Sequence, residues 1–145
     1  MSAVGNIELS ARAAQLLYAY ARAVDEGDLA TLAELAGDDV SITRVDGTHH
    51  GREAFLAVYR GFRDSGLEGS KHVVTNVQAF PEGDGIRAKA YFEATLFDAD
   101  GTRSVIGQYS DSMRDDGGEL RFVHKRIFVE RVVQLAASSP EWSGV

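Results

Sequence analysis

The chain has 145 residues, of which 44% are hydrophobic and 26% charged, as expected for one globular domain of ordinary size. It has no cysteine, which excludes disulfide frameworks, thiolate metal sites and cysteine nucleophiles. Its 15 basic and 22 acidic residues give a net charge of −7, which argues against nucleic acid or an anionic membrane surface as a partner.

The chain shows no run of about 20 apolar residues and no basic N-terminal segment followed by an apolar one. We therefore expect a cytoplasmic protein that has no membrane span and acts on a small molecule. No repeat, linker or low-complexity segment divides the sequence. A single domain over residues 1–145 is predicted, with residues 134–145 as a tail in position to cover a pocket.

The first two fifths of the chain predict helices. Apolar residues recur at steps of three and four from Leu9 to Glu26, which indicates a helix with one buried stripe. Gly27 is a natural stop, and Asp28 is a good N-cap for a short second helix over Leu29–Ala36. A third helix is predicted over Arg52–Asp64.

The remaining segments predict strands. A β-rich run over Val40–Val45 ends at the turn signal Asp46-Gly47, and after Gly69 the apolar period changes to two. Four long strands are predicted over Lys71–Phe80, Ile86–Phe97, Thr102–Arg114 and Leu120–Val133. Segregated helices and strands indicate an α+β fold, and long meandering strands indicate a strongly curved sheet that wraps the helices into a cone.

Asp25 is an unexpected residue for an apolar stripe. It follows Val24 in the last turn of the first predicted helix, where the negative end of the helix dipole would raise its pKa and favour a base. The alternative is a solvated acid at the helix end, beside Glu26 and Asp28.

His72 lies at the start of the strand predicted over Lys71–Phe80. Strict alternation places His72, Val74, Asn76 and Gln78 on one face, and Val73, Thr75, Val77 and Ala79 on the other. The face with His72 points either to solvent or into a polar cavity, where Asn76 could hydrogen-bond a ligand. Histidine titrates nearest to physiological pH, which suits general acid–base work.

Tyr20 precedes Asp25 by five residues, so the two side chains point about 140° apart around the helix. Both can still reach a pocket over the C-terminal half of that helix. A phenol in an apolar site can donate to a developing oxyanion. The alternative is that Tyr20 packs in the core.

No metal or cofactor site is predicted. His49 and His50 are adjacent, so in a strand they point to opposite faces and cannot easily share an ion. The sequence also lacks a phosphate-binding loop, a dinucleotide fingerprint and a Gly-x-Ser-x-Gly elbow.

Several segments resemble the SnoaL-like branch of the NTF2-like superfamily. They are Tyr20–Asp28, Gly51–Ala54, Lys71–Asn76, Gln108–Asp111 and residues 116–122. The resemblance extends from about Leu9 to Val133 and implies three helices wrapped by a curved, mostly antiparallel mixed sheet around a deep apolar pocket. Relatives include scytalone dehydratase, hexachlorocyclohexane dehydrochlorinase, bile-acid 7α-dehydratase, ketosteroid isomerase and polyketide cyclases.

The resemblance also implies roles for individual residues. Asp25 and His72 fall on the aspartate–histidine pair of the dehydratases and the dehydrochlorinase. Tyr20 falls on a tyrosine of bile-acid dehydratase, and ketosteroid isomerase uses the equivalent tyrosine to hold its oxyanion. Arg44 stands where ketosteroid isomerase has its general base, so isomerisation by that mechanism is not expected.

Further residues are predicted to contact substrate. Glu93 is the only acid in its strand and could replace the second histidine of scytalone dehydratase. The dehydrochlorinase has a basic residue near Lys125 or Arg126. The predicted substrate-binding set is Asn76, Tyr91, Glu93, Gln108 and Lys125.

The sequence thus favours a cofactor-independent lyase or isomerase acting on a small apolar ring compound such as a polyketide, steroid or aromatic intermediate. In this hypothesis His72 removes a proton, Asp25 orients the imidazole, and Tyr20 polarises a carbonyl or assists the leaving group. The alternative is a protein that binds a small ligand or associates with other subunits without catalysis. A homodimer or homotrimer formed through the sheet is also predicted.

Overall fold

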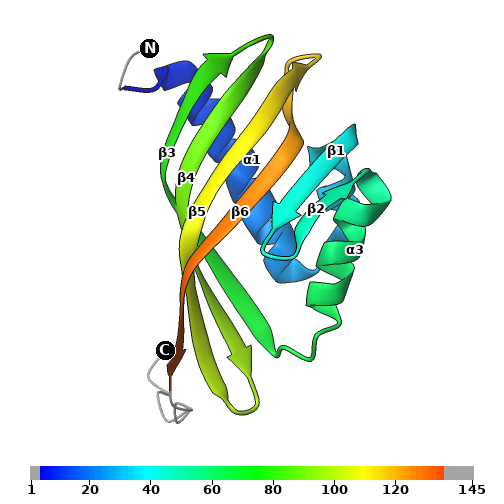
Figure 1. The fold of residues 1–145 in the computed structure, drawn as a ribbon, viewed down its shortest axis with the longest axis vertical. Coiled ribbons are helices and arrows are strands. Elements are labelled where there is room, and N and C mark those ends of the chain that lie inside the picture. Colours follow the sequence, from blue (N-terminus) through cyan, green and yellow to red (C-terminus); the bar gives the residue numbers. More distant parts are fainter. Residues whose placement is uncertain (1–3, 136–145) are drawn as a thin grey trace.

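A computed structural model describes residues 4–135 and arranges them as three helices against one curved, six-stranded sheet (Figure 1). The strand order is β2-β1-β6-β5-β4-β3, in which β1 and β6 are parallel and every other neighbouring pair is antiparallel. The predicted α+β cone with a mixed sheet is confirmed, and the sheet remains open.

Helix α1 (Ile7–Glu26) begins and ends where local chemistry requires. The Asn6 side chain accepts a hydrogen bond from the amide of Leu9 at 3.0 Å, which caps the N-terminus. Gly27 ends the helix in a left-handed conformation with φ of 68°, which glycine adopts without steric cost. The buried stripe of α1 runs from Ala13 to Val24 and packs against the concave side of the sheet.

The other helices are shorter. Asp28 caps α2 (Leu29–Leu35) through the amide of Thr31 at 3.0 Å, as the sequence predicted. Helix α3 (Arg52–Arg63) lies beside β1 and β2 (Figure 1) and buries Phe55, Leu56 and Tyr59.

The five predicted strands are each somewhat longer in the structure, because pairing with a neighbour extends their ends. The strands are β1 (Ala36–Arg44), β2 (Gly47–His50), β3 (Gly69–Glu82), β4 (Gly85–Asp98), β5 (Gly101–Asp116) and β6 (Glu119–Leu135). Strand β2 was not predicted, because its four residues are too few for an apolar period to be recognised. Of the predicted tail, residues 134 and 135 belong to β6 and the rest lies outside the described residues.

A bulge in β3 corrects the predicted faces of that strand. Thr75 pairs with Tyr91, whereas Gln78 pairs with Lys89, so β3 has one more residue than β4 in this interval. Asn76 takes the left-handed conformation with φ of 55°, which asparagine tolerates better than most residues. Val73 and Ala79 were predicted to share one face of the strand, but Val73 is 54% exposed, whereas Ala79, beyond the bulge, is buried.

An ion pair lies inside the core on the concave side of the sheet. The Lys125 ammonium contacts the Asp111 carboxylate at 2.7 Å, and neither side chain is accessible to solvent. The second oxygen of Asp111 accepts the amide of Arg126 at 2.9 Å. Burial lowers the pKa of Lys125 to about 8 and raises the pKa of Asp111, while their mutual attraction opposes both shifts.

We predict that this pair tolerates a paired substitution better than a single one. Lys125→Met strands a buried carboxylate and should lower the free energy of unfolding by about 3–5 kcal/mol. Adding Asp111→Asn removes that charge and keeps an acceptor for the Arg126 amide, so part of the loss should return. Urea denaturation measures the free energy of unfolding of the single and the double variant. Lys89→Met, at an exposed lysine, is the control. A Lys125→Met protein as stable as Lys89→Met would contradict the prediction.

Candidate active site

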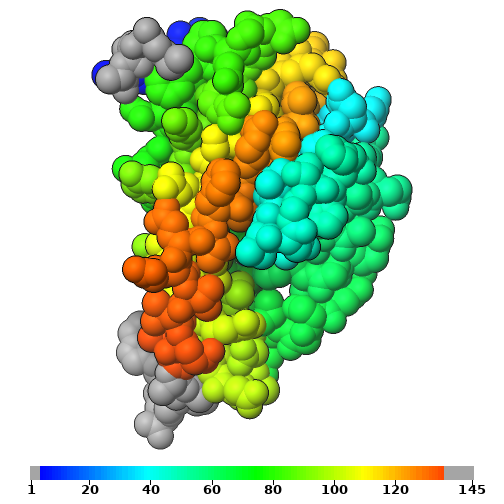
Figure 2. Space-filling model, in the orientation of Figure 1, coloured from blue at the N-terminus to red at the C-terminus, as the bar shows by residue number. Residues whose placement is uncertain are grey.

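A cavity of about 730 Å³ lies between helices α1 and α3 and the concave face of the sheet. In Figure 2 the surface is hollowed below the β1–β2 hairpin, between α3 and the end of β6. Most of the lining is apolar, and it includes Val24, Phe62, Phe92 and Leu96. Only a few polar side chains contribute to this lining, so their positions indicate where a bound molecule could be hydrogen-bonded.

Asp25 and His72 form a hydrogen-bonded pair, of which the His72 ring lines one wall of the cavity. Asp25 comes from the last turn of α1 and His72 from the start of β3, and the ring Nδ1 lies 2.6 Å from the Asp25 carboxylate. The same carboxylate accepts the His72 amide at 2.8 Å and the Ser70 hydroxyl at 2.7 Å. Both side chains are nearly buried, with 11% and 12% exposure. Asp25 is therefore not a solvated helix-end acid.

The electrostatics of Asp25 differ from the expectation based on the helix dipole. Burial opposes ionisation, but the hydrogen bonds from His72 and Ser70 outweigh it, and the pKa of Asp25 falls below its ordinary value. Donors on β3 therefore override the dipole of α1. Asp25 is held as a carboxylate, which suits an orienting group better than a base.

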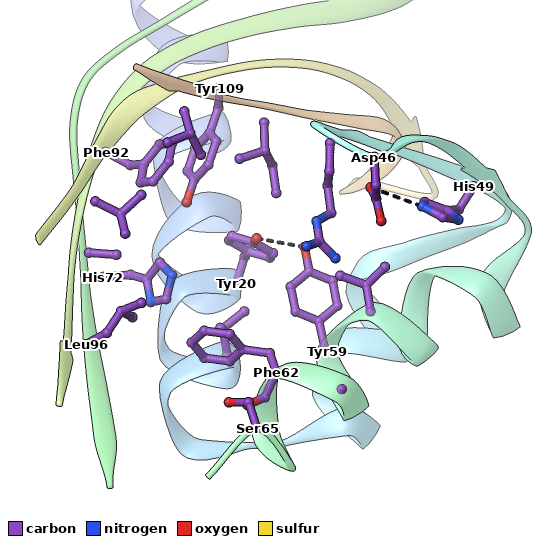
Figure 3. Close-up of a pocket in the computed structure, with 18 of the residues that line it drawn as sticks. Tyr20, Asp46, His49, Tyr59, Phe62, Ser65, His72, Phe92, Leu96 and Tyr109 are labelled. Atoms are coloured by element: carbon purple, nitrogen blue, oxygen red, sulfur yellow. Dashed lines mark hydrogen bonds and ion pairs between the residues drawn. The ribbon is translucent and has the colours of Figure 1, made fainter. Parts of the chain in front are cut away.

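This geometry determines which ring nitrogen of His72 can act as a base. A carboxylate only accepts hydrogen bonds, so Nδ1 carries a proton, and in the neutral ring Nε2 is the nitrogen with the lone pair. Within residues 4–135 no side chain hydrogen-bonds Nε2. The ring lines the cavity, and Phe62 packs edge-on against it with 5.9 Å between ring centroids. Figure 3 shows His72 on the wall opposite Asp46 and His49.

Two phenol groups lie between these walls. The hydroxyls of Tyr20 and Tyr59 are 2.7 Å apart, and both residues line the cavity (Figure 3). Burial raises the pKa of both phenols well above the ordinary value, so they remain neutral donors at physiological pH. Tyr20 packs in the core, as in its alternative interpretation, and also presents its hydroxyl toward the cavity.

Tyr109 completes the cavity wall. Its ring stacks on Phe92 with centroids 4.4 Å apart, and it meets Tyr20 edge-on at 6.0 Å. These rings line the cavity without filling it. Trp142, in the C-terminal tail that was predicted to cover a pocket, lies outside the described residues.

Four of the predicted substrate-binding residues do not line this cavity. Asn76, Tyr91, Glu93 and Gln108 are exposed, and three of them border a separate depression, whose lining contains Asn76, Tyr91 and Gln108. The alternation of β4 explains this placement, because Phe92 and Ala94 point inward and their neighbours therefore point outward. These residues belong to the convex face of the sheet.

Lys125, the fifth predicted contact, is directed inward but does not line the cavity. Its ammonium lies 3.2 Å from the centroid of the Tyr109 ring and 4.7 Å from that of Tyr20, on the Asp111 side of both. Lys125 therefore supports the aromatic wall from behind.

Two polar residues of the cavity, Arg44 and Tyr59, were not among the predicted site residues. Arg44 was considered only as the residue at the position of the ketosteroid isomerase base. Tyr59 belongs to the apolar face of α3, where a phenol is most simply interpreted as core. Arg44 follows Val40 and Ile42 at steps of two, and both are fully buried. That alternation directs Arg44 inward and was the available signal.

Within residues 4–135 no three histidine, aspartate or glutamate side chains gather closely enough to hold a metal ion. None of the helices in this part of the chain has the length and apolar character needed to cross a membrane.

A family model described as a SnoaL-like domain matches residues 6–126, which is most of the chain. The chain belongs to the SnoaL-like family. This assignment confirms the resemblance drawn from the sequence. A comparison with curated proteins gives no significant match.

Solved structures show the same fold as this SnoaL-like protein. The hexachlorocyclohexane dehydrochlorinase LinA-type3 from Novosphingobium barchaimii has a TM-score of 0.79 at 18% identity, covering 92% of this chain and 96% of that one. A protein provisionally assigned as a scytalone dehydratase, from Novosphingobium aromaticivorans, has a TM-score of 0.79 at 17% identity, covering 93% and 94%. A protein from Kribbella flavida, Kfla4162, has a TM-score of 0.77 at 15% identity, covering 88% and 95%.

The hydrogen bonds of Asp25 predict how this SnoaL-like protein responds to acid. Because the pKa of Asp25 is lower in the folded chain, its carboxylate stabilises the fold above the unfolded pKa of about 3.9, and this contribution is lost as the pH falls through the folded value. Asp25→Asn should therefore cost about 1–3 kcal/mol at pH 7. The difference in free energy of unfolding between Asp25→Asn and wild type should become smaller below about pH 4.

Chemical denaturation at several pH values measures this gap. The matched control is Glu26→Gln, which alters the neighbouring exposed acid of α1. A gap for Asp25→Asn that stays constant from pH 7 to pH 3 would show that the hydrogen bonds of Asp25 do not favour its ionised form.

Proposed function

We propose that this protein is a cofactor-independent lyase or isomerase of the dehydratase type, acting on a small, largely apolar ring compound. The observation that carries the proposal is the Asp25–His72 hydrogen bond of 2.6 Å, on the wall of a cavity large enough for such a compound. The volume of about 730 Å³ falls within the range of roughly 300–1,000 Å³ typical of small-molecule sites.

The reaction begins at Nε2 of His72. This nitrogen takes a proton from a carbon next to a carbonyl, and the electron pair of the C–H bond moves toward the carbonyl to give an enolate. The imidazolium that forms is stabilised by Asp25, which accepts from the opposite nitrogen. A fixed carboxylate of low pKa fits this task, because it remains charged throughout.

The enolate oxygen needs a neutral donor in a site with little water. The Tyr20–Tyr59 pair supplies hydroxyl protons at the surface of the cavity. In an elimination, the electron pair then returns to form a C=C bond as the leaving group departs, and the imidazolium gives its proton to that leaving group, which restores the neutral His72 ring. In an isomerisation, the imidazolium returns the proton to a different carbon. Either outcome balances without an oxidant or a metal.

The names of two similar structures support elimination as the reaction class. One is a dehydrochlorinase and the other is provisionally a dehydratase, and each name describes loss of a small molecule from a carbon framework. At 18% and 17% identity these structures share the fold of this chain, and the Asp25–His72 hydrogen bond is the observation that supports proposing the same class of chemistry.

We predict that His72→Gln abolishes turnover while leaving the protein folded. Cyclic ketones and β-hydroxy ketones incubated with wild-type protein in D₂O should gain deuterium at the activated carbon or lose water, as followed by NMR. Loss of the base should reduce this rate by about 10²–10⁴-fold. Asp25→Asn should lower it by more than about 10²-fold, because the orienting charge is lost.

The matched control is His50→Gln, on an exposed histidine of β2 whose ring meets Ser41 rather than the cavity. It should retain wild-type rates. A His72→Gln protein that still exchanges deuterium at the wild-type rate would refute the mechanism. Binding of the ketones without exchange in wild type would favour the non-catalytic, ligand-binding alternative.

We also propose that the protein forms a homodimer or homotrimer through the convex face of its sheet. Large apolar side chains are exposed there, among them Val73, Tyr91 and Phe128 at 54%, 55% and 49%. Apolar patches of this kind on a single chain commonly mark contact surfaces, and closed cyclic symmetry is the usual result of self-association.

Light scattering at micromolar concentration tests this assembly. We expect a mass of two or three times 15.7 kDa. Phe128→Glu should lower this mass toward that of a single chain. A wild-type mass near 15.7 kDa would show that this face is exposed to water in solution.

A further inference from the structure

Arg44 places a positive charge at the cavity end of β1. It continues the inward alternation of Val40 and Ile42, both 0% exposed, so its side chain points where an apolar residue would be expected. Arg44 lines the cavity together with Asp46 and His49 from the adjoining turn and β2. In Figure 3 Asp46 and His49 lie across the cavity from His72.

The Arg44 guanidinium makes no hydrogen bond and no ion pair within residues 4–135. The nearest acid along the chain is Asp46, whose carboxylate is 52% exposed and pairs with His49 at 3.2 Å. The His49 ring, and more weakly the Arg44 charge, lower the pKa of Asp46, which keeps that rim carboxylate ionised and directed to His49.

A guanidinium without a counterion in a mostly apolar cavity is unfavourable unless a ligand compensates it. Arginine presents a planar fork of donors that matches a carboxylate in two parallel hydrogen bonds. Other arginines with acids in reach are already paired, as Arg12 is with Asp115 at 2.8 Å and Arg52 with Asp38 at 2.8 Å. Arg44 is thus available to a ligand.

We propose that the compound bound in this cavity carries a carboxylate, and that Arg44 binds it. That the compound is a substrate rests on the proposed function, whereas its binding does not. The ring body of the compound lies against the apolar wall that includes Phe92 and Leu96. Its carboxylate meets Arg44 at one end, and its reactive carbon faces His72 at the other. Arg44 is in this sense a specificity-determining residue.

Matched pairs of probes test the proposal. Naphthalene-2-carboxylate, indole-3-carboxylate and 4-phenylbenzoate are each compared with the corresponding neutral amide by calorimetric titration at pH 7. Hydrogen bonds to a charged group correspond to roughly a 10- to 100-fold preference. Wild type should therefore bind at least one acid about 10-fold or more tightly than its amide.

Variants assign this preference to one residue. Arg44→Met should abolish the preference while changing amide affinity less than about twofold, and Arg44→Lys should retain part of it because the charge remains. Arg60→Met, on an exposed arginine of α3 outside the cavity, should behave as wild type. Urea denaturation of each variant verifies that it is folded, and Arg44→Lys serves if Arg44→Met does not fold.

The outcomes separate this proposal from the catalytic one. If no acid binds more tightly than its amide, or if the preference survives in Arg44→Met, Arg44 is not a carboxylate site. Loss of the preference in His72→Gln but not in Arg44→Met would also overturn it. If His72→Gln retains both the acid preference and full turnover, the catalytic proposal fails while the Arg44 site stands.

Discussion

The carboxylate of Asp25 connects the two layers of the molecule. It lies at the end of α1 and accepts hydrogen bonds from a backbone amide, a ring nitrogen and a hydroxyl of β3. The backbone bond fixes the helix against the sheet, and the ring bond fixes the orientation of His72. A single ionised group therefore determines both how the cone is assembled and which nitrogen faces the cavity. Under the proposed function, Asp25 therefore contributes both to the stability of the fold and to catalysis, so substitution of Asp25 should affect both.

The shape of the cavity follows from irregularities in the strands. Pairing shifts by one residue in β3, and further shifts occur between β5 and β6, near Gly107 and Met113. Each bulge bends its strand and increases the local twist, so that the long strands curve around α1 instead of running flat. Gly107 has no side chain, and a Cβ there would meet the Phe128 carbonyl and the Phe92 ring. The stacked aromatic wall therefore depends on that position remaining small.

Much of this architecture could be predicted from periodicity. Helix α1 and the four long strands have enough residues for the period to be unambiguous, and the Asp25–His72 pair followed from the family resemblance. The directions of the side chains on β3 and β4 were harder to predict from the sequence. Asn76 lies at a bulge that no local motif predicts. Tyr91 and Gln108 were predicted to bind substrate, but their buried neighbours Phe92 and Tyr109 point inward, so they point outward. Tyr59 was missed because a phenol in an apolar stripe looks like packing until its hydroxyl is seen against Tyr20.

The buried pair of Lys125 and Asp111 also restricts how this sequence can change over time. Each charge is tolerated only because the other is 2.7 Å away, and neither side chain is accessible to solvent. A lineage that replaces one of them first passes through a protein with a lone charge in its core, and selection acts against that intermediate. The two positions are therefore expected to vary together or not at all among descendants of this chain. Substitutions of Tyr109 and Tyr20 are expected to be restricted in the same way, because both rings pack directly against the ammonium group.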